Sequence, residues 1–224
     1  MSRPPIATPI LAACLLAALA TGAEPGTGAS VGFGGRSRAG SWTPLVVSGL
    51  PAGAVIRVAV QDPDGSFVRS PPVRVPAEGR ARFAVRRGRP AGPARVEGGR
   101  SGAVDGIDLP PSLPSTEGVL MLIGDLPSLQ RAARLLGDDG GTRLAVIGPG
   151  PDADAAWTAR DLDGVDAVVA CGRSLEGLGS GLLDGIDAWV RDGGRLVLAA
   201  GASALPLAAR GGVAAGWLPG SVEE

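Results

Sequence analysis

Hydrophobic positions follow two different periods along the chain, and the change falls near residue 118. Before it, short runs rich in β-branched residues alternate with polar positions and are separated by Gly and Pro. Several short strands with turn signals about every ten residues predict a β-sandwich. The predicted strands are residues 30–34, 42–47, 55–61, 67–75, 80–86 and 94–97.

Turn chemistry sharpens this prediction at two places. The turn Asp62-Pro63-Asp64-Gly65 lies between two alternating runs, and it predicts a hairpin because Pro presets φ and Gly supplies a positive φ. Pro44 interrupts the Trp42 run, which favours an edge position or a late entry into the ladder. Residues 100–117 have the Gly, Pro and Ser content of a linker. We assign residues 24–108 to the sandwich and residues 109–117 to the linker.

After the linker, buried-strand runs alternate with helical spacing. Such alternation predicts an α/β domain with a parallel sheet, which we assign to residues 118–224. Past Gly201 the pattern decays, so we expect the domain to be incomplete at Glu224. The predicted strands are 118–123, 142–147, 165–171 and 195–200, the predicted helices are 126–136 and 175–190, and residues 148–163 form a loop rich in Asp and Pro.

Two stretches resemble the class I glutamine amidotransferase-like superfamily: 163–169, DGVDAVV, and 188–198, AWVRDGGRLVL. The sandwich, with GSWTPLV at 40–46 and DPDG at 62–65, is similar to the first module of uncharacterised bacterial envelope proteins. Those proteins join an immunoglobulin-like domain to an amidotransferase-like one and carry a membrane anchor further downstream. The resemblance implies an immunoglobulin-like sandwich followed by a flavodoxin-like, amidotransferase-like α/β sheet.

The same resemblance places a nucleophilic cysteine at the turn after strand 195–200. Here that turn reads Ala199-Ala-Gly-Ala-Ser203, without a cysteine. The chain also contains no histidine to activate one. The resemblance therefore implies the fold of the family but not the catalytic activity of its enzymes.

Composition narrows the chemistry further. The chain has no histidine, tyrosine or lysine, so most catalytic constellations cannot be assembled from it. A net charge of −1 argues against nucleic-acid binding. The charge is uneven: residues 24–108 hold 12 Arg against 7 acidic residues, whereas residues 109–224 hold 8 Arg against 15 acidic residues.

The first 23 residues are typical of a secretion signal. Arg3 precedes the apolar run Ile6–Leu19, and Ala18-Leu-Ala20 is a cleavage signature. The alternative is a lipoprotein acylated at Cys14, because Leu11-Ala-Ala-Cys14 resembles a lipobox. Either way we expect an exported protein of the periplasm or cell surface. A membrane anchor in the full-length protein, downstream or as a lipid on Cys14, stays open as an alternative. Cleavage leaves Cys171 alone, so no intramolecular disulfide forms.

The loops at the carboxyl ends of the predicted parallel strands are the candidate binding site. Ligands of open α/β sheets bind in the crevice at these ends, and glycine lets backbone N–H groups approach them. Cys171 has two interpretations, a thiol activated at a helix start or a buried cysteine at a strand end. The candidate residues are Gly124, Asp125, Gly148, Cys171, Arg173, Ser174, Gly201 and Ser203.

Three further groups have structural and functional interpretations. An acidic loop has the oxygen ligands that Ca²⁺ or Mg²⁺ prefers, but its spacing matches no EF-hand, and we expect turn and capping roles and no metal. A basic cluster suits an anionic polysaccharide, lipid headgroups, the acidic α/β domain or plain solvent. Trp189 lies on an apolar helix face and is expected in the core. The acidic loop contains Asp152, Asp154, Asp161, Asp163 and Asp166, and the basic cluster contains Arg80, Arg82, Arg86, Arg87 and Arg89.

These observations favour a non-catalytic exported envelope protein with a binding or assembly role. Its expected partner is an envelope protein or an anionic glycan, with no cofactor and no nucleic acid. Two alternatives stay open. One is an envelope hydrolase that uses carboxylates or Cys171, and the other is a receptor for a small ligand at the strand ends.

Overall fold

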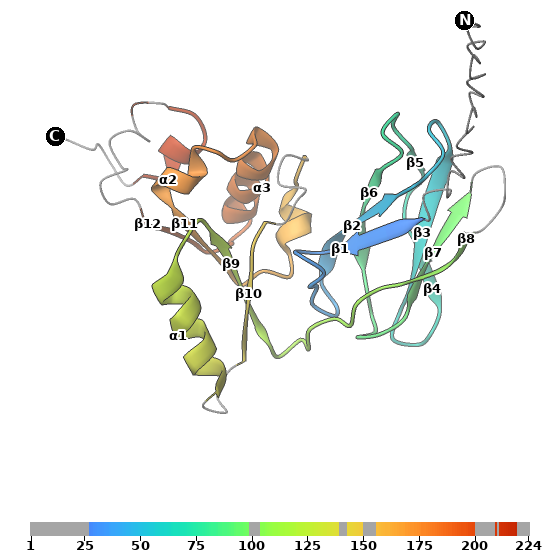
Figure 1. Cartoon of the computed structure of the whole chain (residues 1–224), viewed down its shortest axis with the longest axis horizontal. Helices are drawn as coiled ribbons and strands as arrows, with labels where there is room; N and C mark the ends of the chain where they lie inside the picture. The colour runs from blue at the N-terminus through green and yellow to red at the C-terminus, as the bar shows by residue number, and fades with distance from the viewer. Residues whose placement is uncertain are drawn as a thin grey trace, which may run out of the picture.

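The computed structural model describes residues 27–98, 104–138, 143–149, 156–199, 209 and 211–218. An antiparallel β part is followed by a part built on a parallel sheet, and the two lie side by side (Figure 1). No helix within the described ranges is long and apolar enough to cross a membrane. The predicted signal segment and Cys14 lie outside the described residues.

The sandwich consists of two antiparallel sheets. The first has the order β1-β2-β6, and the second has the order β4-β3-β7-β8 with β5 also paired to β3. Alternate residues face a shared core, as the inward Ala81, Phe83 and Val85 of β6 show. The strands are β1 (Gly28–Val31), β2 (Trp42–Ser48), β3 (Val55–Gln61), β4 (Phe67–Arg69), β5 (Val73–Arg74), β6 (Ala81–Arg86), β7 (Pro93–Gly98) and β8 (Val104–Asp108).

The predicted hairpin at residues 62–65 is present between β3 and β4. Gly65 has a φ of +90°, and its N–H donates to the Asp62 carbonyl at 2.9 Å. Gln61 then pairs with Phe67 across the turn. The local turn signal was therefore sufficient to predict this connection.

Of the two alternatives for the Trp42 strand, the edge position is wrong, because β2 lies between β1 and β6. The late entry is present, because β2 pairs with β1 only from Leu45 onwards. Pro44 pairs with Ala84 of β6. On the other side, β1 ends at Val31, opposite Leu45, so Pro44 lies just past the end of β1 and its missing N–H breaks no pairing there. A proline is tolerated in a central strand where the neighbouring strand has already ended.

Other strand bounds also differ from the sequence prediction. The predicted strand 30–34 lies earlier, as β1 at residues 28–31, and the turn that follows begins at Gly32, which has a φ of +61°. The predicted strand 67–75 is split into β4 and β5, with two prolines, Pro71 and Pro72, between them. The sequence does not predict β8, because this Gly- and Asp-containing stretch lacks an alternating pattern and has the composition of a linker. It pairs antiparallel with β7.

The linker after β8 lies along the sandwich. Leu109 is buried in the sandwich core, and the Leu113 N–H donates to the Ser37 carbonyl at 2.7 Å. The buried guanidinium of Arg87 donates to the Pro110 carbonyl at 2.7 Å, and desolvation lowers the pKa of Arg87. These contacts fasten the linker to the sandwich where it leads into the second part.

The second part has a four-stranded parallel sheet of order β10-β9-β11-β12. Its strands are β9 (Gly118–Ile123), β10 (Leu144–Ile147), β11 (Ala167–Cys171) and β12 (Leu196–Ala199), close to the predicted bounds. Because β9 lies between β10 and β11, the strand order reverses beside β9. Such a reversal is the usual position of a ligand crevice in open parallel sheets.

Helices lie on both sides of this sheet in Figure 1. Helix α1 (Pro127–Asp138) follows β9 and packs against β10. The predicted helix 175–190 is instead two helices, α2 (Gly172–Leu175) and α3 (Ser180–Arg191), because Gly177 and Gly179 fall between them. The predicted loop 148–163 contains a 3-10 helix, η1 (Ala159–Leu162), and a second one, η3 (Ala214–Trp217), lies near the end.

The two faces of the parallel sheet are covered unequally. One face contributes Met121, Ile147 and Val168 to a core that also contains Ile186 and, as predicted, Trp189 from α3. On the opposite face, Val197 of β12 is 54% exposed. On that face Leu122 of the central strand β9 is buried, so the exposed part of the sheet lies towards its β12 edge.

Candidate functional site

Trp157 connects the sandwich to the parallel-sheet part. Its ring stacks on Phe33, with ring centroids 5.4 Å apart and an interplanar angle of 17°. The Arg82 guanidinium carbon lies 4.2 Å from the Trp157 ring centroid. Trp157 is 6% exposed and belongs to the core that contains Trp189. Phe33 and Arg82 come from the sandwich, so one tryptophan joins both parts.

Charged groups surround this aromatic contact. Arg38 forms a two-point ion pair with Asp166 and also donates to the Glu117 carbonyl at 2.6 Å. The backbone N–H of Trp42 donates to the Asp163 carboxylate at 3.0 Å. The basic excess of the sandwich thus meets the acidic excess of the second part directly.

Most of the predicted basic cluster contacts the chain itself. Arg82 lies 3.5 Å from the Asp161 carboxylate, and Arg86 donates to the Gly40 carbonyl at 2.7 Å. Arg87 is buried against the linker, and Arg89 donates to the Pro63 carbonyl at 3.2 Å. Of the partners considered for this cluster, the acidic α/β part is the one that the structure places against Arg82.

The predicted acidic loop serves the same interface where it is described. Asp161, 4% exposed, accepts hydrogen bonds from the Thr158 N–H at 2.9 Å and the Thr158 hydroxyl at 3.0 Å, a capping box at the start of η1. Asp163 and Asp166 bind sandwich groups. Within the described ranges no group of acidic or cysteine side chains could hold a metal ion. Asp152 and Asp154 lie outside these ranges.

The carboxylate of Asp166 is stabilised in its charged form. Burial by itself raises the pKa of Asp166, but hydrogen bonds from Arg38 and from the Val119 N–H outweigh burial and hold the pKa below its usual value. A depressed pKa means that the charged carboxylate stabilises the fold. This contribution is complete at pH values above the unfolded pKa of about 3.9, and it is lost as the pH falls through the folded-state pKa.

We therefore expect Asp166→Asn to lower the free energy of unfolding by about 1 kcal/mol at neutral pH, a modest value because the side chain is half exposed. The difference from the unmodified protein should shrink towards zero as the pH falls from about 5 to about 2. Urea unfolding across this range measures it. Asp184→Asn, at an exposed position of α3, is the control. A difference that is the same at every pH would show that ionisation of Asp166 plays no part.

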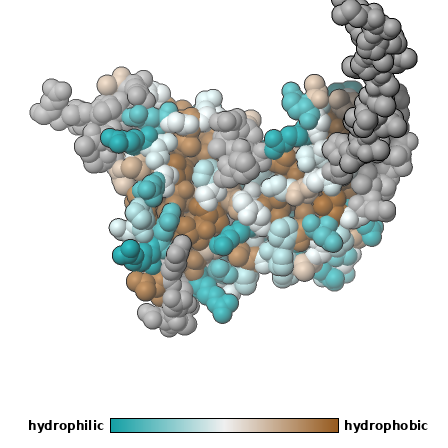
Figure 2. Space-filling model, in the orientation of Figure 1, coloured by the Kyte–Doolittle hydropathy of each residue, from teal (hydrophilic) through white to brown (hydrophobic). Residues whose placement is uncertain are grey.

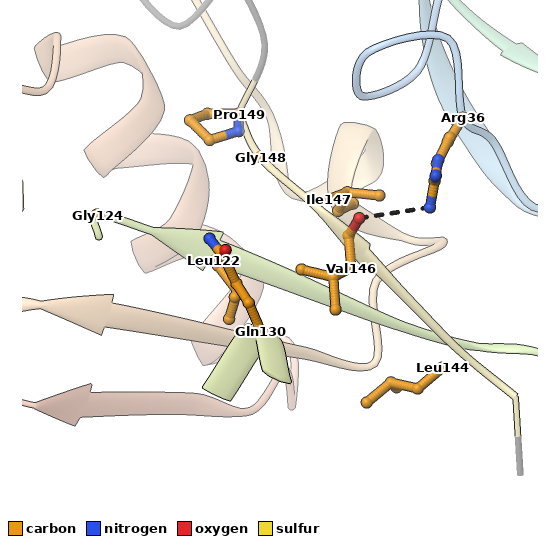
Figure 3. A pocket seen from close by; sticks show the side chains of 9 residues that line it. All are labelled: Arg36, Leu122, Gly124, Gln130, Leu144, Val146, Ile147, Gly148 and Pro149. Carbon is orange, nitrogen blue, oxygen red and sulfur yellow. Dashed lines mark hydrogen bonds between the residues drawn. The ribbon is translucent and has the colours of Figure 1, made fainter. Parts of the chain in front are cut away.

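A hollow of about 640 Å³ lies beside β10, at the carboxyl ends of β9 and β10. This volume is within the range of small-molecule sites. In Figure 2, hydrophobic surface shows between α1 and the sandwich. Figure 3 shows Leu122 of β9 next to Gln130 of α1, and Gly148 and Pro149 following β10. The lining residues are Arg36, Leu122, Gly124, Gln130, Leu144, Val146, Ile147, Gly148 and Pro149.

Arg36 brings a positive charge to this hollow from the sandwich. It lies in the loop between β1 and β2, where Phe33 and Arg36 form an isolated bridge. Its guanidinium donates to the Val146 carbonyl across 3.5 Å, a long hydrogen bond (Figure 3). The side chain is otherwise exposed. The hollow is consequently shared between the two parts of the chain.

Two of the predicted site residues, Gly124 and Gly148, line the hollow. Gly124 has a φ of +105°, and a Cβ there would lie 2.2 Å from the Ser174 hydroxyl and 3.2 Å from the Cys171 Cβ. Gly124, Cys171 and Ser174 therefore meet where the strand order reverses. Cys171 ends β11 directly before α2, as predicted, and is partly exposed.

The remaining predicted site residues do not line the hollow. Asp125 and Arg173 are exposed and are not among its lining residues, and Gly201 and Ser203 lie outside the described residues. Their role in binding stays a prediction.

Sequence reasoning missed Arg36 and Gln130. Arg36 is 110 residues from its partner Val146 in the sequence, so no local pattern connects them. Gln130 had a detectable signal, because it is a polar residue in the first turns of the helix that follows a strand-end glycine. A scan against protein-family models found no match for the chain, and neither did a search of curated proteins. A proposal for the function therefore rests on the geometry of the hollow.

Proposed function

We propose that this chain is a non-catalytic binding protein of the bacterial cell envelope, and that its ligand occupies the hollow beside β10. The hollow itself is the observation that carries the proposal. Glycines at two strand ends open the backbone to a ligand, Gln130 offers an amide, and Arg36 offers a charge. A ligand with a carboxylate or phosphate and an apolar portion suits this lining.

The architecture supports an immunoglobulin-like module followed by an amidotransferase-like one, as the sequence resemblance implies. An enzymatic role has less support. The chain lacks histidine, lysine and tyrosine. The carboxylates of Asp161, Asp163 and Asp166 are engaged in contacts within and between the two parts of the chain. A working hydrolase would need such groups to face a substrate.

The proposal includes export, supported by Arg3, the apolar run that follows and the Ala18-Leu-Ala20 signature. N-terminal sequencing of the protein from a bacterial host tests it. A mature chain that begins near Thr21 or Glu24 supports export, a diacylglycerol adduct on Cys14 supports the lipoprotein alternative, and retention of Met1 in the cytoplasm contradicts both.

A fragment screen tests the binding site. We expect members of a panel of small carboxylates and phosphates to shift the backbone amide resonances of Gly124 and Gly148. Gly148→Trp should abolish the shift at Gly124, because a Cβ at Gly148 meets nothing within 4 Å and the indole would fill the hollow. Arg36→Glu should weaken anion binding by about tenfold or more.

Matched substitutions control both changes. Gly177→Trp adds the same side chain at another open glycine, between α2 and α3. Arg74→Glu reverses an exposed arginine that also donates to a backbone carbonyl, that of Gly53 at 3.1 Å. Neither should change fragment binding. If no fragment binds, or if the controls weaken binding as much as Gly148→Trp does, the assignment to this hollow fails.

A further inference from the structure

The outer edge of β10 carries backbone groups that its sheet does not use. β10 is paired only with β9 among the described strands. The Gly118 N–H donates to the Arg143 carbonyl, and this hydrogen bond fixes which residues of β10 pair with β9. In this hydrogen-bonding pattern the backbone groups of Ala145 and Ile147 bond to β9, whereas the N–H and C=O groups of Leu144 and Val146 point away from it.

The contact with Arg36 supports this hydrogen-bonding pattern independently. Its guanidinium reaches the Val146 carbonyl, which must therefore point outward from the sheet. At 3.5 Å the hydrogen bond is long, and a better-placed donor would replace it. The Leu144 and Val146 side chains lie on the sheet face that carries α1, because those of Ala145 and Ile147 are in the opposite core.

The hollow runs along this edge, since Leu144, Val146, Gly148 and Pro149 all line it. An unpaired strand edge beside a groove is the geometry that accepts an added β-strand. The backbone would supply hydrogen bonds, and the groove would receive alternate side chains. Arg36, released from Val146, would then meet an acid.

We propose that the partner at this site is an extended peptide segment that pairs with the outer edge of β10 and places a carboxylate, from a side chain or a chain end, on Arg36. This inference rests on the proposed binding function and names its ligand class. A protein segment is favoured over a small anion because the outward N–H and C=O groups recur at alternate residues, a spacing that another backbone matches.

Selection from a phage-displayed library of random dodecapeptides against the purified protein provides the probe. We expect enriched sequences that alternate apolar and polar residues and contain Asp or Glu. A synthetic copy of an enriched peptide should bind the Val146→Pro variant about tenfold or more weakly than it binds the unmodified protein. Proline at this position removes an outward N–H and obstructs the edge, but it leaves the hydrogen bonds to β9 intact.

Arg36→Glu should weaken the same peptide to a similar degree, and Arg74→Glu should leave its affinity within about twofold. Hydrogen exchange gives a readout that needs no variant. The amides of Leu144 and Val146 should exchange rapidly in the free protein and slow by about tenfold or more when the peptide is bound. Those of Ala145 and Ile147 should be protected in both states.

The outcomes separate this inference from the function beneath it. If no peptide is enriched, or if enriched peptides bind Val146→Pro unchanged, strand pairing is wrong. If small anionic fragments nevertheless bind and Gly148→Trp abolishes their binding, the hollow remains the ligand site. If neither peptides nor fragments bind, both proposals fail. Strong protection of the Leu144 and Val146 amides from hydrogen exchange in the free protein would also contradict the inference, because it would show that this edge of β10 is already paired.

Discussion

Replacing Trp157 with alanine should lower the free energy of unfolding by about 3–5 kcal/mol, the range for removing a large buried aromatic. The substitution removes the stack on Phe33, the contact with the Arg82 guanidinium and the packing against α3 in one step. Because the first two partners belong to the sandwich, the coupling between the two parts of the chain should also weaken, although the contact between Arg38 and Asp166 remains. Urea unfolding, followed by circular dichroism, measures the loss.

Two variants bracket this expectation. Trp157→Phe keeps an aromatic face for Phe33 and Arg82, and it should cost about 1–2 kcal/mol. Trp217→Ala removes a half-buried tryptophan whose indole N–H donates to Asp187 at 3.1 Å, away from the sandwich, and should cost about as much as Trp157→Phe. A loss below about 1 kcal/mol for Trp157→Ala would mean that this residue does not hold the interface together.

The second large effect is expected at Gly185 in α3. A Cβ there would lie 2.6 Å from the Trp157 Cβ and 3.0 Å from its carbonyl carbon, so the helix touches the Trp157 backbone. Alanine would improve helix propensity by up to about 1 kcal/mol, but relieving this clash costs more. We expect Gly185→Val to lower the free energy of unfolding by about 3 kcal/mol, measured by urea denaturation.

Ala188→Val is the matched control, because it introduces the same branched side chain at an exposed position of the same helix. Only the difference in helix propensity should appear there, about 0.5 kcal/mol. If Gly185→Val falls within about 1 kcal/mol of this control, α3 can move away from Trp157 at little cost, and the close approach is not needed for stability.

The sequence by itself determined those elements whose signals are local. Strand 55–61 and strand 118–123 have the predicted bounds, since a run of apolar residues reports burial directly. The hairpin at residues 62–65 was predicted from its turn residues, and Trp189 from its place on an apolar helix face. In each case the residues that specify the structure are neighbours in the chain.

The tertiary structure decided what depends on distant partners. β8 forms because β7 offers it an edge, although its own sequence has little strand character. Pro44 is accepted in a central strand because β1 ends beside it. Trp157 and Arg36 acquire their roles from contacts between the sandwich and the parallel-sheet part. The hollow beside β10 follows from the same packing, since its charge and its strand edge come from segments that only the fold brings together.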